Sequence, residues 1–212
     1  MKIKVILFDF GRVLADFDFM NFARIVEKFS LLSAEEIVKK TVDNKPMSRF
    51  QKGQTSPMEF FREMKKELKM SGMKYQQFKF AWNAVLVHPD KKTEKILSRI
   101  KPDVKILILS TNDALHWGKE NKYKMVKRYF PLSCQRVLSH KVGAEKPELK
   151  IYKKALGRYN IPASQTLYID DNRTYLEAFQ KLGGNTIYYS CRLHSFDYLT
   201  RELNEFGVLN KN

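Results

Sequence analysis

Three carboxylates in this chain follow apolar runs that have the length of buried strands. Asp9 comes directly after the run 5–8, and Asp170 and Asp171 come after the run 167–169, about 160 residues later. In open α/β folds, ligands bind beyond the carboxyl ends of the strands, where side chains from distant segments can meet. Carboxylate oxygens are preferred ligands of Mg²⁺. The spacing therefore indicates a phosphoryl-transfer site built around Mg²⁺.

Two further polar residues follow the strands expected between these carboxylates. Ser110 ends the apolar run 104–109, and Lys146 lies in a loop after the run 134–138. An aspartate can attack phosphorus to give an acyl phosphate, a serine hydroxyl can bind a phosphoryl oxygen, and a lysine can neutralise the transferring group. Each residue alone has a commoner explanation, because serine often begins a turn and a lysine is usually solvated. Their order along the chain favours the catalytic interpretation.

The segment 19–88 has the pattern of packed helices. Apolar residues recur at helical spacing from Phe19 onwards. Two stretches, 33–36 and 56–59, carry the serine and glutamate of a capping box, and the second also has proline at its first helical position. We therefore expect several helices in this segment, two of them beginning at these boxes.

From residue 90 onwards the expected helices and strands alternate. This rhythm is typical of a parallel sheet with helices on both faces. We predict an α/β fold with a doubly wound parallel sheet, formed by residues 1–15 and 90–212 and interrupted by a helical insertion at 16–89. Strands are expected at 104–109, 134–138, 166–169 and 186–189, and helices near 90–101, 114–129, 148–159, from 173 to 183, and up to about 206.

The composition is that of an ordinary folded protein. The 212 residues are 43% apolar and 29% charged, which is enough to bury a real core. No apolar stretch exceeds strand length, so we expect no membrane span. Cys134 and Cys191 lack metal-binding spacing and are expected to be free thiols. Because no signal-peptide pattern precedes the first strand, we expect a cytoplasmic protein.

The formal net charge of +16 has two explanations. It could serve binding to nucleic acid or another acidic surface, or it could reflect a lysine-rich solvated exterior. Lysine doublets are spread along the whole chain and accompany no nucleic-acid-binding module, so we favour the solvated exterior. A positive field would still attract anionic phosphate substrates.

Four segments carry these residues, and together they resemble the motifs of haloacid dehalogenase (HAD) superfamily phosphatases with a helical cap domain. The likeness covers essentially the full length and is close to the branch that contains bacterial α-glucose-1-phosphate phosphatase and the N-terminal domain of soluble epoxide hydrolase. It implies a Rossmann-like core domain at 1–15 and 90–212 and a cap domain at 16–89. The motifs are, in order, Phe8 to Leu14, Leu109 to Asn112, Lys146 to Glu148, and Ile169 to Asn172.

The resemblance implies a Mg²⁺ site and a nucleophile. Asp9 matches the nucleophile, which is also a metal ligand, and the backbone carbonyl of Gly11 matches a second ligand. Asp171 matches the direct acidic ligand of the fourth motif, with Asp170 close by or bridged through water. The implied reaction is Mg²⁺-dependent hydrolysis of a phosphate monoester through a phosphorylated aspartate.

The resemblance also implies the residues that bind phosphate and substrate. Ser110 matches the phosphate-binding hydroxyl, and Lys146 matches the lysine that steadies nucleophile and phosphate, so both are catalytic and substrate-binding candidates. Thr111 and Asn112 are further substrate-binding candidates, although this branch often has asparagine at position 111. Arg12 stands where relatives often have glycine or asparagine; it could contact the substrate or point to solvent.

One departure concerns the general acid. Most phosphatases of this superfamily carry an aspartate two residues after the nucleophile, whereas this chain has Gly11, as does the branch just named. A glycine cannot protonate a leaving group, so we expect either a preference for good leaving groups or a proton from elsewhere. Asp16 and Asp18 are the nearest acidic candidates in the sequence, and His116 is the histidine expected nearest to Ser110.

Three functions remain open at this stage. A phosphatase acting on a small phosphate ester, such as a sugar phosphate, is the leading hypothesis. A 2-haloacid dehalogenase uses the same aspartate without metal, but typically has tyrosine where this chain has Gly11. A non-catalytic basic binding protein would retain only the fold. The sequence gives no indication of the oligomeric state.

Overall fold

A computed structural model of the chain describes residues 2–42 and 44–210. Its centre is a five-stranded parallel sheet in the order β5-β4-β1-β6-β7, which confirms the predicted fold class. Because β1 lies between β4 and β6, the residues that follow these three strands meet at one edge of the sheet. The strands are β1 Val5–Phe8, β4 Lys105–Ser110, β5 Arg136–Leu138, β6 Thr166–Asp170 and β7 Asn185–Tyr188.

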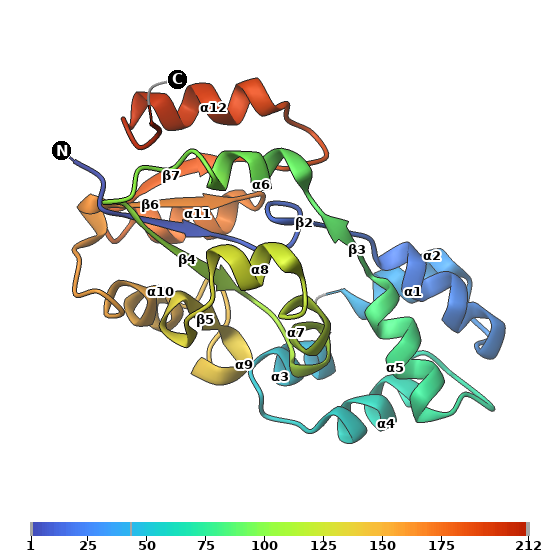
Figure 1. Cartoon of the computed structure of the whole chain (residues 1–212). Helices are drawn as coiled ribbons and strands as arrows, with labels where there is room; N and C mark the ends of the chain where they lie inside the picture. The colour runs from blue at the N-terminus through green and yellow to red at the C-terminus, as the bar shows by residue number, and fades with distance from the viewer. Residues whose placement is uncertain (1, 43, 211–212) are drawn as a thin grey trace.

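Seven α-helices of the described chain surround this sheet (Figure 1). The strands β4 and β5 lie on one side of β1, and β6 and β7 lie on the other. The helices that connect these strands cover both faces of the sheet. These helices are α6 Lys91–Leu97, α7 Ala114–Glu120, α8 Lys124–Tyr129, α9 Ser139–Val142, α10 Leu149–Leu156, α11 Arg173–Gln180 and α12 Phe196–Glu205.

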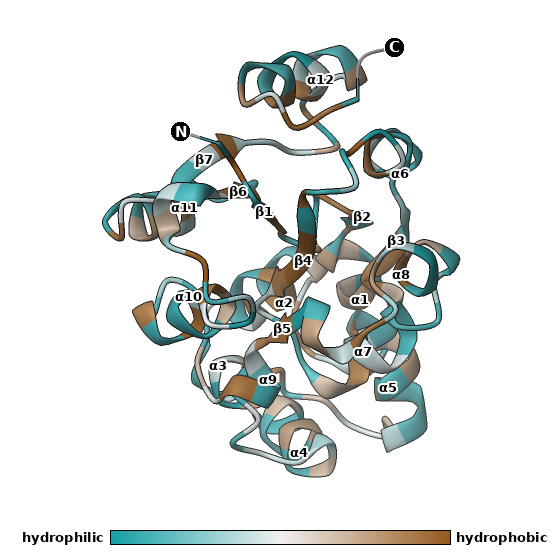
Figure 2. Ribbon diagram, turned by 60° about the vertical axis from the view of Figure 1, so that its left-hand side comes forward, coloured by the Kyte–Doolittle hydropathy of each residue, from teal (hydrophilic) through white to brown (hydrophobic). Residues whose placement is uncertain are grey.

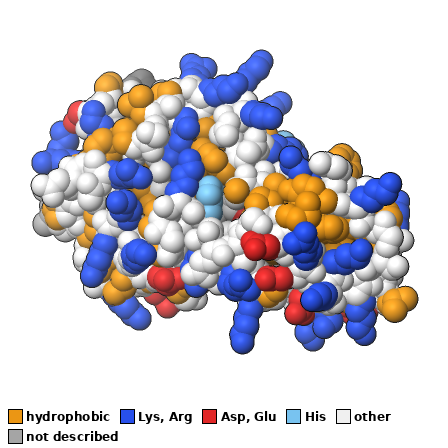
Figure 3. Space-filling model, turned by 90° about the horizontal axis from the view of Figure 1, so that it is seen from below, with side chains coloured by type: hydrophobic (Ala, Val, Ile, Leu, Met, Phe, Trp, Pro, Cys, Tyr) orange, Lys and Arg blue, Asp and Glu red, His pale blue; other side chains and the backbone are white. Residues whose placement is uncertain are grey.

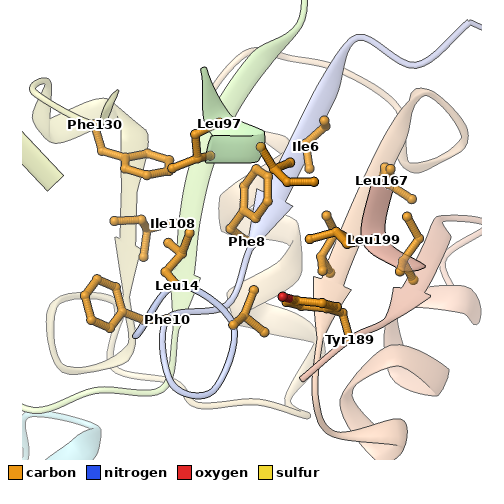
Figure 4. Close-up of a cluster of buried hydrophobic side chains, with 14 of the residues drawn as sticks. Ile6, Phe8, Phe10, Leu14, Leu97, Ile108, Phe130, Leu167, Tyr189 and Leu199 are labelled. Carbon is orange, nitrogen blue, oxygen red and sulfur yellow. The ribbon is translucent and has the colours of Figure 1, made fainter. Parts of the chain in front are cut away.

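The alternation of side chains along β1 divides the core into two apolar clusters. Ile6 and Phe8 pack with residues of α6, α8 and α12, whereas Val5 and Leu7 pack with residues of α10 and α11. Successive strand side chains point to opposite faces, so a strand that is apolar throughout needs cover on both. Figure 4 shows the first cluster, with Phe8 among side chains from neighbouring strands and helices. In Figure 2 the central strands are brown and the outer helices largely teal.

Helices α1–α5 form a separate layer beyond the edge of the sheet toward which the strands run (Figure 1). A short antiparallel ribbon, β2 Ala15–Phe17 and β3 Leu86–Pro89, leads into and out of this layer. Its helices enclose an apolar cluster around fully buried Phe60, Phe78 and Trp82, to which α7 adds Leu115. The helices are α1 Phe19–Val26, α2 Ala34–Thr41, α3 Lys45–Gln51, α4 Pro57–Glu67 and α5 Tyr75–Ala84.

The two capping boxes begin helices as predicted. The hydroxyl oxygens of Ser33 and Ser56 accept from the backbone N–H groups of Glu36 and Glu59, whose carboxylates accept from the serine N–H groups in return. Each exchange satisfies two N–H groups that the first turn of a helix leaves without a partner. These local signals therefore fix the starts of α2 and α4.

The single helix expected at 114–129 is wrong, because the structure has α7 and α8 with a turn between them. Tyr123 adopts an extended conformation in this turn, with φ −60° and ψ 136°. Its ring stacks on Phe10, with centroids 6.3 Å apart, and α8 then buries Met125 and Val126. Tertiary packing of the tyrosine thus overrides the helical pattern. The ribbon of β2 and β3 and the short helix α3 are also not among the expected elements.

Within residues 2–42 and 44–210, no helix is both long enough and apolar enough to cross a membrane. Lysine and arginine side chains are spread over the face in Figure 3, interrupted by acidic and apolar groups.

Candidate active site

Lys146 lies between two carboxylates at the edge of the sheet. Its Nζ donates to Asp9 Oδ1 at 2.6 Å and to Asp170 Oδ2 at 2.7 Å. All three residues are buried, so little water screens these charges. The backbone N–H of Lys146 donates to the hydroxyl oxygen of Thr111 at 3.0 Å, which ties its loop to the residue after β4. The lysine is therefore held against both aspartates.

Asp170 accepts hydrogen bonds on both carboxylate oxygens. The Asn172 N–H donates to Oδ1 at 2.8 Å, and the Tyr168 hydroxyl joins Lys146 in donating to Oδ2. Asp171 differs, because its side chain is 20% exposed and its nearest cation, Arg12, is 3.9 Å away. Asp170 is thus suited to be the fixed counter-charge of Lys146, while Asp171 has a freer carboxylate for a cation.

The three aspartates form a cluster whose negative charge exceeds the charge of its lysine. Asp9, Asp170 and Asp171 each place a carboxylate oxygen within 4.8 Å of the other two. Fully ionised, they leave two negative charges beyond the one that Lys146 neutralises. Burial raises the pKa of Asp9, with Lys146 opposing and both neighbouring carboxylates adding to the rise. Burial and the charge of Asp170 also raise the pKa of Asp171 to about 6.

This cluster fits Mg²⁺. A divalent cation supplies the two charges that the cluster lacks, and carboxylate oxygens are the ligands this hard ion prefers. Asp9 and Asp171 are the residues best able to hold it, and Gly11 also lines the cavity. When bound, the ion would neutralise repulsion between Asp9 and an incoming phosphate.

A cavity of about 290 Å³ opens over this cluster. A wider hollow of about 540 Å³ shares Met47, Gln51, Thr111, Lys146 and Tyr175 with it. Asp170 does not line the cavity and contacts Lys146 instead. The structure brings the other residues proposed from the sequence to the cavity wall, namely Asp9, Gly11, Arg12, Ser110, Thr111, Asn112, Lys146 and Asp171.

Asn112 uses both the oxygen and the nitrogen of its side-chain amide within the protein. Its Oδ1 accepts from the backbone N–H of Asp113 at 2.7 Å, and its Nδ2 donates to Glu120 Oε2. Its backbone N–H donates to Ser139 Oγ at 2.8 Å. Asn112 therefore holds Glu120 in place, a role that the sequence motif did not indicate.

Arg12 occupies a backbone conformation that favours glycine, with φ +57°. A non-glycine residue in the left-handed region costs about 1–2 kcal/mol. Its side chain is 47% exposed and lines the cavity beside Asp171. The guanidinium is thus available at the cavity mouth rather than directed away from it.

Asp16 and Asp18, the acidic candidates nearest to Gly11 in sequence, do not line the cavity. Both pair with Arg192: its Nε lies 2.5 Å from Asp16 Oδ1 and its Nη2 3.5 Å from Asp18 Oδ2. Asp18 also caps α1, where it accepts from the N–H of Met20. The structure therefore gives both residues other partners.

His116 and Glu120, from consecutive turns of α7, lie on the cavity wall instead. His116 Nδ1 lies 2.9 Å from Asp113 Oδ2, and its Nε2 lies 2.8 Å from the Trp82 carbonyl oxygen. Because both ring nitrogens face acceptors, the ring is held as imidazolium. Burial opposes that charge, but the Asp113 carboxylate prevails and raises the pKa of His116.

Glu120 and the α3 residues Met47 and Gln51 are wall residues that the sequence analysis missed. Glu120 follows Ser110 by ten positions, so only the helical path of α7 brings it back to the site. A local signal for α3 exists: Asn44 caps the helix by accepting from the Met47 N–H, and a proline occupies its first turn.

One curated relative has a similar length and a named activity. D-ribitol-5-phosphate phosphatase of Bacteroides thetaiotaomicron is 25% identical over 187 residues, which cover 87% of this chain and 90% of that protein.

Solved structures with the same fold include several HAD family enzymes. One from B. thetaiotaomicron, in complex with magnesium and inorganic phosphate, is 25% identical with a TM-score of 0.78 and covers 93% of this chain and 98% of its own. A HAD-like hydrolase of Porphyromonas gingivalis (20% identity, TM-score 0.80, covering 96% and 98%) and L-2-haloacid dehalogenase of Xanthobacter autotrophicus (19%, 0.63, 95% and 82%) share the fold. The family model for haloacid dehalogenase-like hydrolases matches residues 6–189. This chain therefore belongs to the haloacid dehalogenase-like hydrolase family.

Proposed function

We propose that this hydrolase is a Mg²⁺-dependent phosphatase that cleaves small phosphate monoesters through a phosphorylated Asp9. The observation that carries the proposal is the buried cluster in which Lys146 contacts Asp9 and Asp170 beneath the cavity. A carboxylate held there by an ammonium group is positioned to attack an electrophile that enters from the cavity. The surplus negative charge of the three aspartates supports the requirement for a divalent cation.

The remaining wall residues take roles that follow from their chemistry. Asp9 attacks phosphorus while the bond to the leaving oxygen breaks, and water then hydrolyses the acyl phosphate and regenerates the carboxylate. Lys146 steadies Asp9 and a phosphoryl oxygen, and the Ser110 hydroxyl donates to another. Arg12 and the loop at Thr111 and Asn112 lie where they can contact the bound ester.

The helical layer supplies the walls around the leaving group, and we propose that residues 16–89 are a cap domain on a core of 1–15 and 90–212. Phe17, Phe19, Met47 and Gln51 of this segment line the cavity. Because an organic group attached to the phosphate would face these residues, they would contribute to specificity. A sugar or sugar-alcohol phosphate is the substrate class that the named relative supports.

The dehalogenase alternative is less compatible with the charges of the site. A 2-haloacid is a carboxylate, and without a cation the surplus negative charge of the three aspartates would repel it. A phosphate ester carries its own negative charge, but it would enter together with a divalent cation. Dependence of activity on Mg²⁺ separates the two reactions.

A library of phosphate esters tests the proposal most broadly. The purified protein should release phosphate from some of them in the presence of Mg²⁺, and chelation by EDTA should abolish release. Asp9→Asn is the matched variant, because it keeps the size of the side chain but removes the nucleophilic carboxylate. Phosphate release by Asp9→Asn at the wild-type rate would exclude the mechanism.

A further inference from the structure

A buried carboxyl group on the cavity wall has no role in the mechanism above. Glu120 is 3% exposed, lines the cavity, and belongs to the last turn of α7. Its Oε2 accepts from Asn112 Nδ2. A charged side chain is rarely buried without partners, because the loss of hydration is costly. The position of Glu120 therefore requires an explanation.

The neighbouring cations, Lys119 and His116, donate no hydrogen bond to the Glu120 carboxylate. The Nζ of Lys119 donates to the carbonyl oxygens of Asn83 and Leu86, at 2.9 and 3.2 Å. His116 directs its two ring nitrogens at Asp113 and at the Trp82 backbone. Across the described residues, Asn112 is the one hydrogen-bond donor to the Glu120 carboxylate. A carboxylate can accept about four hydrogen bonds, so Glu120 retains unused capacity beside the cavity.

The protonation state of Glu120 also suits a partner that both donates and accepts. Burial raises its pKa to about 7, although the nearby His116 charge and the Asn112 hydrogen bond oppose the rise. Near neutral pH the group can accept as a carboxylate or donate as an acid. A substrate hydroxyl offers both functions.

Another part of the cavity wall is apolar and lies close to Gly11. Phe17 and Phe19 contact each other edge to face, with centroids 5.0 Å apart, and both line the cavity. A Cβ built on Gly11 would lie 4.0 Å from Phe17 Cγ, so the space left by the missing aspartate opens toward this wall. The centroids of the Phe17 and His116 rings lie 5.9 Å apart. The cavity wall thus combines aromatic rings with polar side chains of α7.

We propose that Glu120, held by Asn112, is a specificity-determining residue that binds a hydroxyl group of the leaving alcohol, so that the enzyme selects phosphate esters of polyhydroxylated compounds. The proposal rests on the proposed phosphatase function and deepens it. The C–H groups of a polyol or sugar would pack on Phe17 and Phe19 while its hydroxyls face α7. A site built to bind a hydroxyl discriminates strongly against analogues that lack it, because its buried polar groups then stay unpaired.

Three esters and two variants test the assignment. D-ribitol 5-phosphate carries hydroxyls, pentyl phosphate has the same chain length without them, and phenyl phosphate has a good leaving group without them. Glu120→Gln keeps the shape of the side chain, and Glu120→Leu removes its polarity. We expect Glu120→Leu to lower kcat/KM for ribitol phosphate by about 10- to 100-fold, as for a lost hydrogen bond to a charged group, with a smaller fall for Glu120→Gln. Phenyl and pentyl phosphate should change less than about 3-fold, which is within the usual effect of a neutral substitution.

The controls separate this proposal from the proposed function and from a structural role. Glu202→Gln in α12, which does not line the cavity, should leave the activity on all three esters unchanged, and circular dichroism should show that the variants are folded. An equal fall for all esters would overturn the proposal, because Glu120 would then merely support the site. A fall that is largest for pentyl and smallest for phenyl phosphate would also overturn it, because that pattern belongs to a proton donor. Failure of the phosphatase function itself would appear differently, as wild-type protein without activity that depends on Mg²⁺ and Asp9.

Discussion

Gly53, in the loop after α3, lies directly against the carbonyl group of His140 in α9. A Cβ on Gly53 would overlap that oxygen, and the φ of Gly53 is +67°, a region that other residues rarely adopt. Three hydrogen-bonded or ionic contacts surround this point: Ser48 Oγ donates to Glu145 Oε1 at 2.6 Å, Ser139 Oγ lies 2.6 Å from the Gln51 carbonyl, and Lys52 Nζ lies 3.6 Å from Glu145. The helical layer and the sheet are therefore joined closely beside Lys146.

We predict that Gly53→Ala destabilises the protein and raises KM, because it moves α3 away from α9. Backbone strain and overlap each cost about 1–3 kcal/mol, so the melting temperature should fall by several degrees. Because Met47 and Gln51 of α3 line the cavity, KM should rise as well. Gly72→Ala is the matched control, since Gly72 has a similar φ of +72° but a Cβ there would have no atom of the described residues within 4 Å. Equal effects of the two variants on KM would contradict the role of this contact.

Removal of one carboxylate from the aspartate cluster should stabilise the metal-free protein. The pKa of Asp171 is raised in the folded state from 3.8 to about 6. Ionisation of Asp171 therefore lowers the free energy of unfolding as the pH rises above 3.8, and this destabilisation is complete above about pH 6. Metal-free Asp171→Asn should therefore melt higher than wild type at pH 8, and the difference should shrink toward pH 4.

Addition of Mg²⁺ should reverse that order. The ion binds the folded wild type and raises its melting temperature, whereas Asp171→Asn lacks the acidic ligand and should respond far less. Thermal unfolding with and without Mg²⁺ at several pH values measures both effects. An equal rise in both proteins would exclude Asp171 as a ligand.

The lack of a general acid at Gly11 should limit the leaving groups that the enzyme accepts. Without a general acid, phenyl phosphate should react faster than pentyl phosphate when chemistry limits the rate, because the alkoxide leaves poorly. Gly11→Asp should narrow this gap by raising kcat for pentyl phosphate about 10-fold or more, since general acids contribute about 10²–10⁴-fold. The structure has room, because among residues 2–42 and 44–210 a Cβ at this position meets only Phe17, at ordinary contact distance. Gly11→Asn is the control, because it has a similar shape but cannot donate as an acid.

His116 should contribute stability that depends on pH. Its folded pKa is raised above the usual 6.5, mainly by Asp113 acting against burial, so its contribution is complete below pH 6.5 and is lost as pH rises through the folded value. The free energy of unfolding lost in His116→Gln should therefore be largest at low pH and smaller toward pH 10. Asp113 stays ionised throughout this window, because its pKa is lowered.

Glu120 titrates in the same range, so the comparison of wild type with His116→Gln should be repeated in a Glu120→Gln background. Chemical unfolding across pH 5.5–10 supplies the measurement. A destabilisation that grows with pH would contradict an imidazolium between Asp113 and the Trp82 carbonyl.

The parts of this fold that were predictable are those set by local pattern. The apolar runs before Asp9 and Asp170 predict strands that are buried on both faces of the sheet, because they lack the alternation of a half-exposed strand. Ser56 and Glu59 fix the start of α4 through bonds three residues apart. The collection of Asp9, Lys146 and Asp170 at one point followed from the rule for parallel sheets and from the family motifs.

The parts that were not predictable depend on tertiary contacts. Tyr123 stacks on Phe10 and interrupts the helix that the sequence pattern predicts. Glu120 reaches the cavity only because Asn112 and the turns of α7 direct it there. Arg192, 176 positions away, forms an ion pair with Asp16. Asp16, one of the two acidic residues nearest to Gly11 in sequence, is therefore not available in the cavity. None of these contacts has a local signal.

The most direct test of the central claim is detection of the phosphorylated nucleophile. The protein is mixed with excess Mg²⁺ and a substrate found in the library, quenched in acid within one turnover, and reduced with borohydride, which converts an aspartyl phosphate to homoserine. Mass spectrometry of the peptide that contains Asp9 should then show homoserine at position 9, and samples with EDTA should not. An unmodified Asp9 in a sample that has released phosphate, or homoserine at Asp170 or Asp171 instead, would contradict the proposed nucleophile.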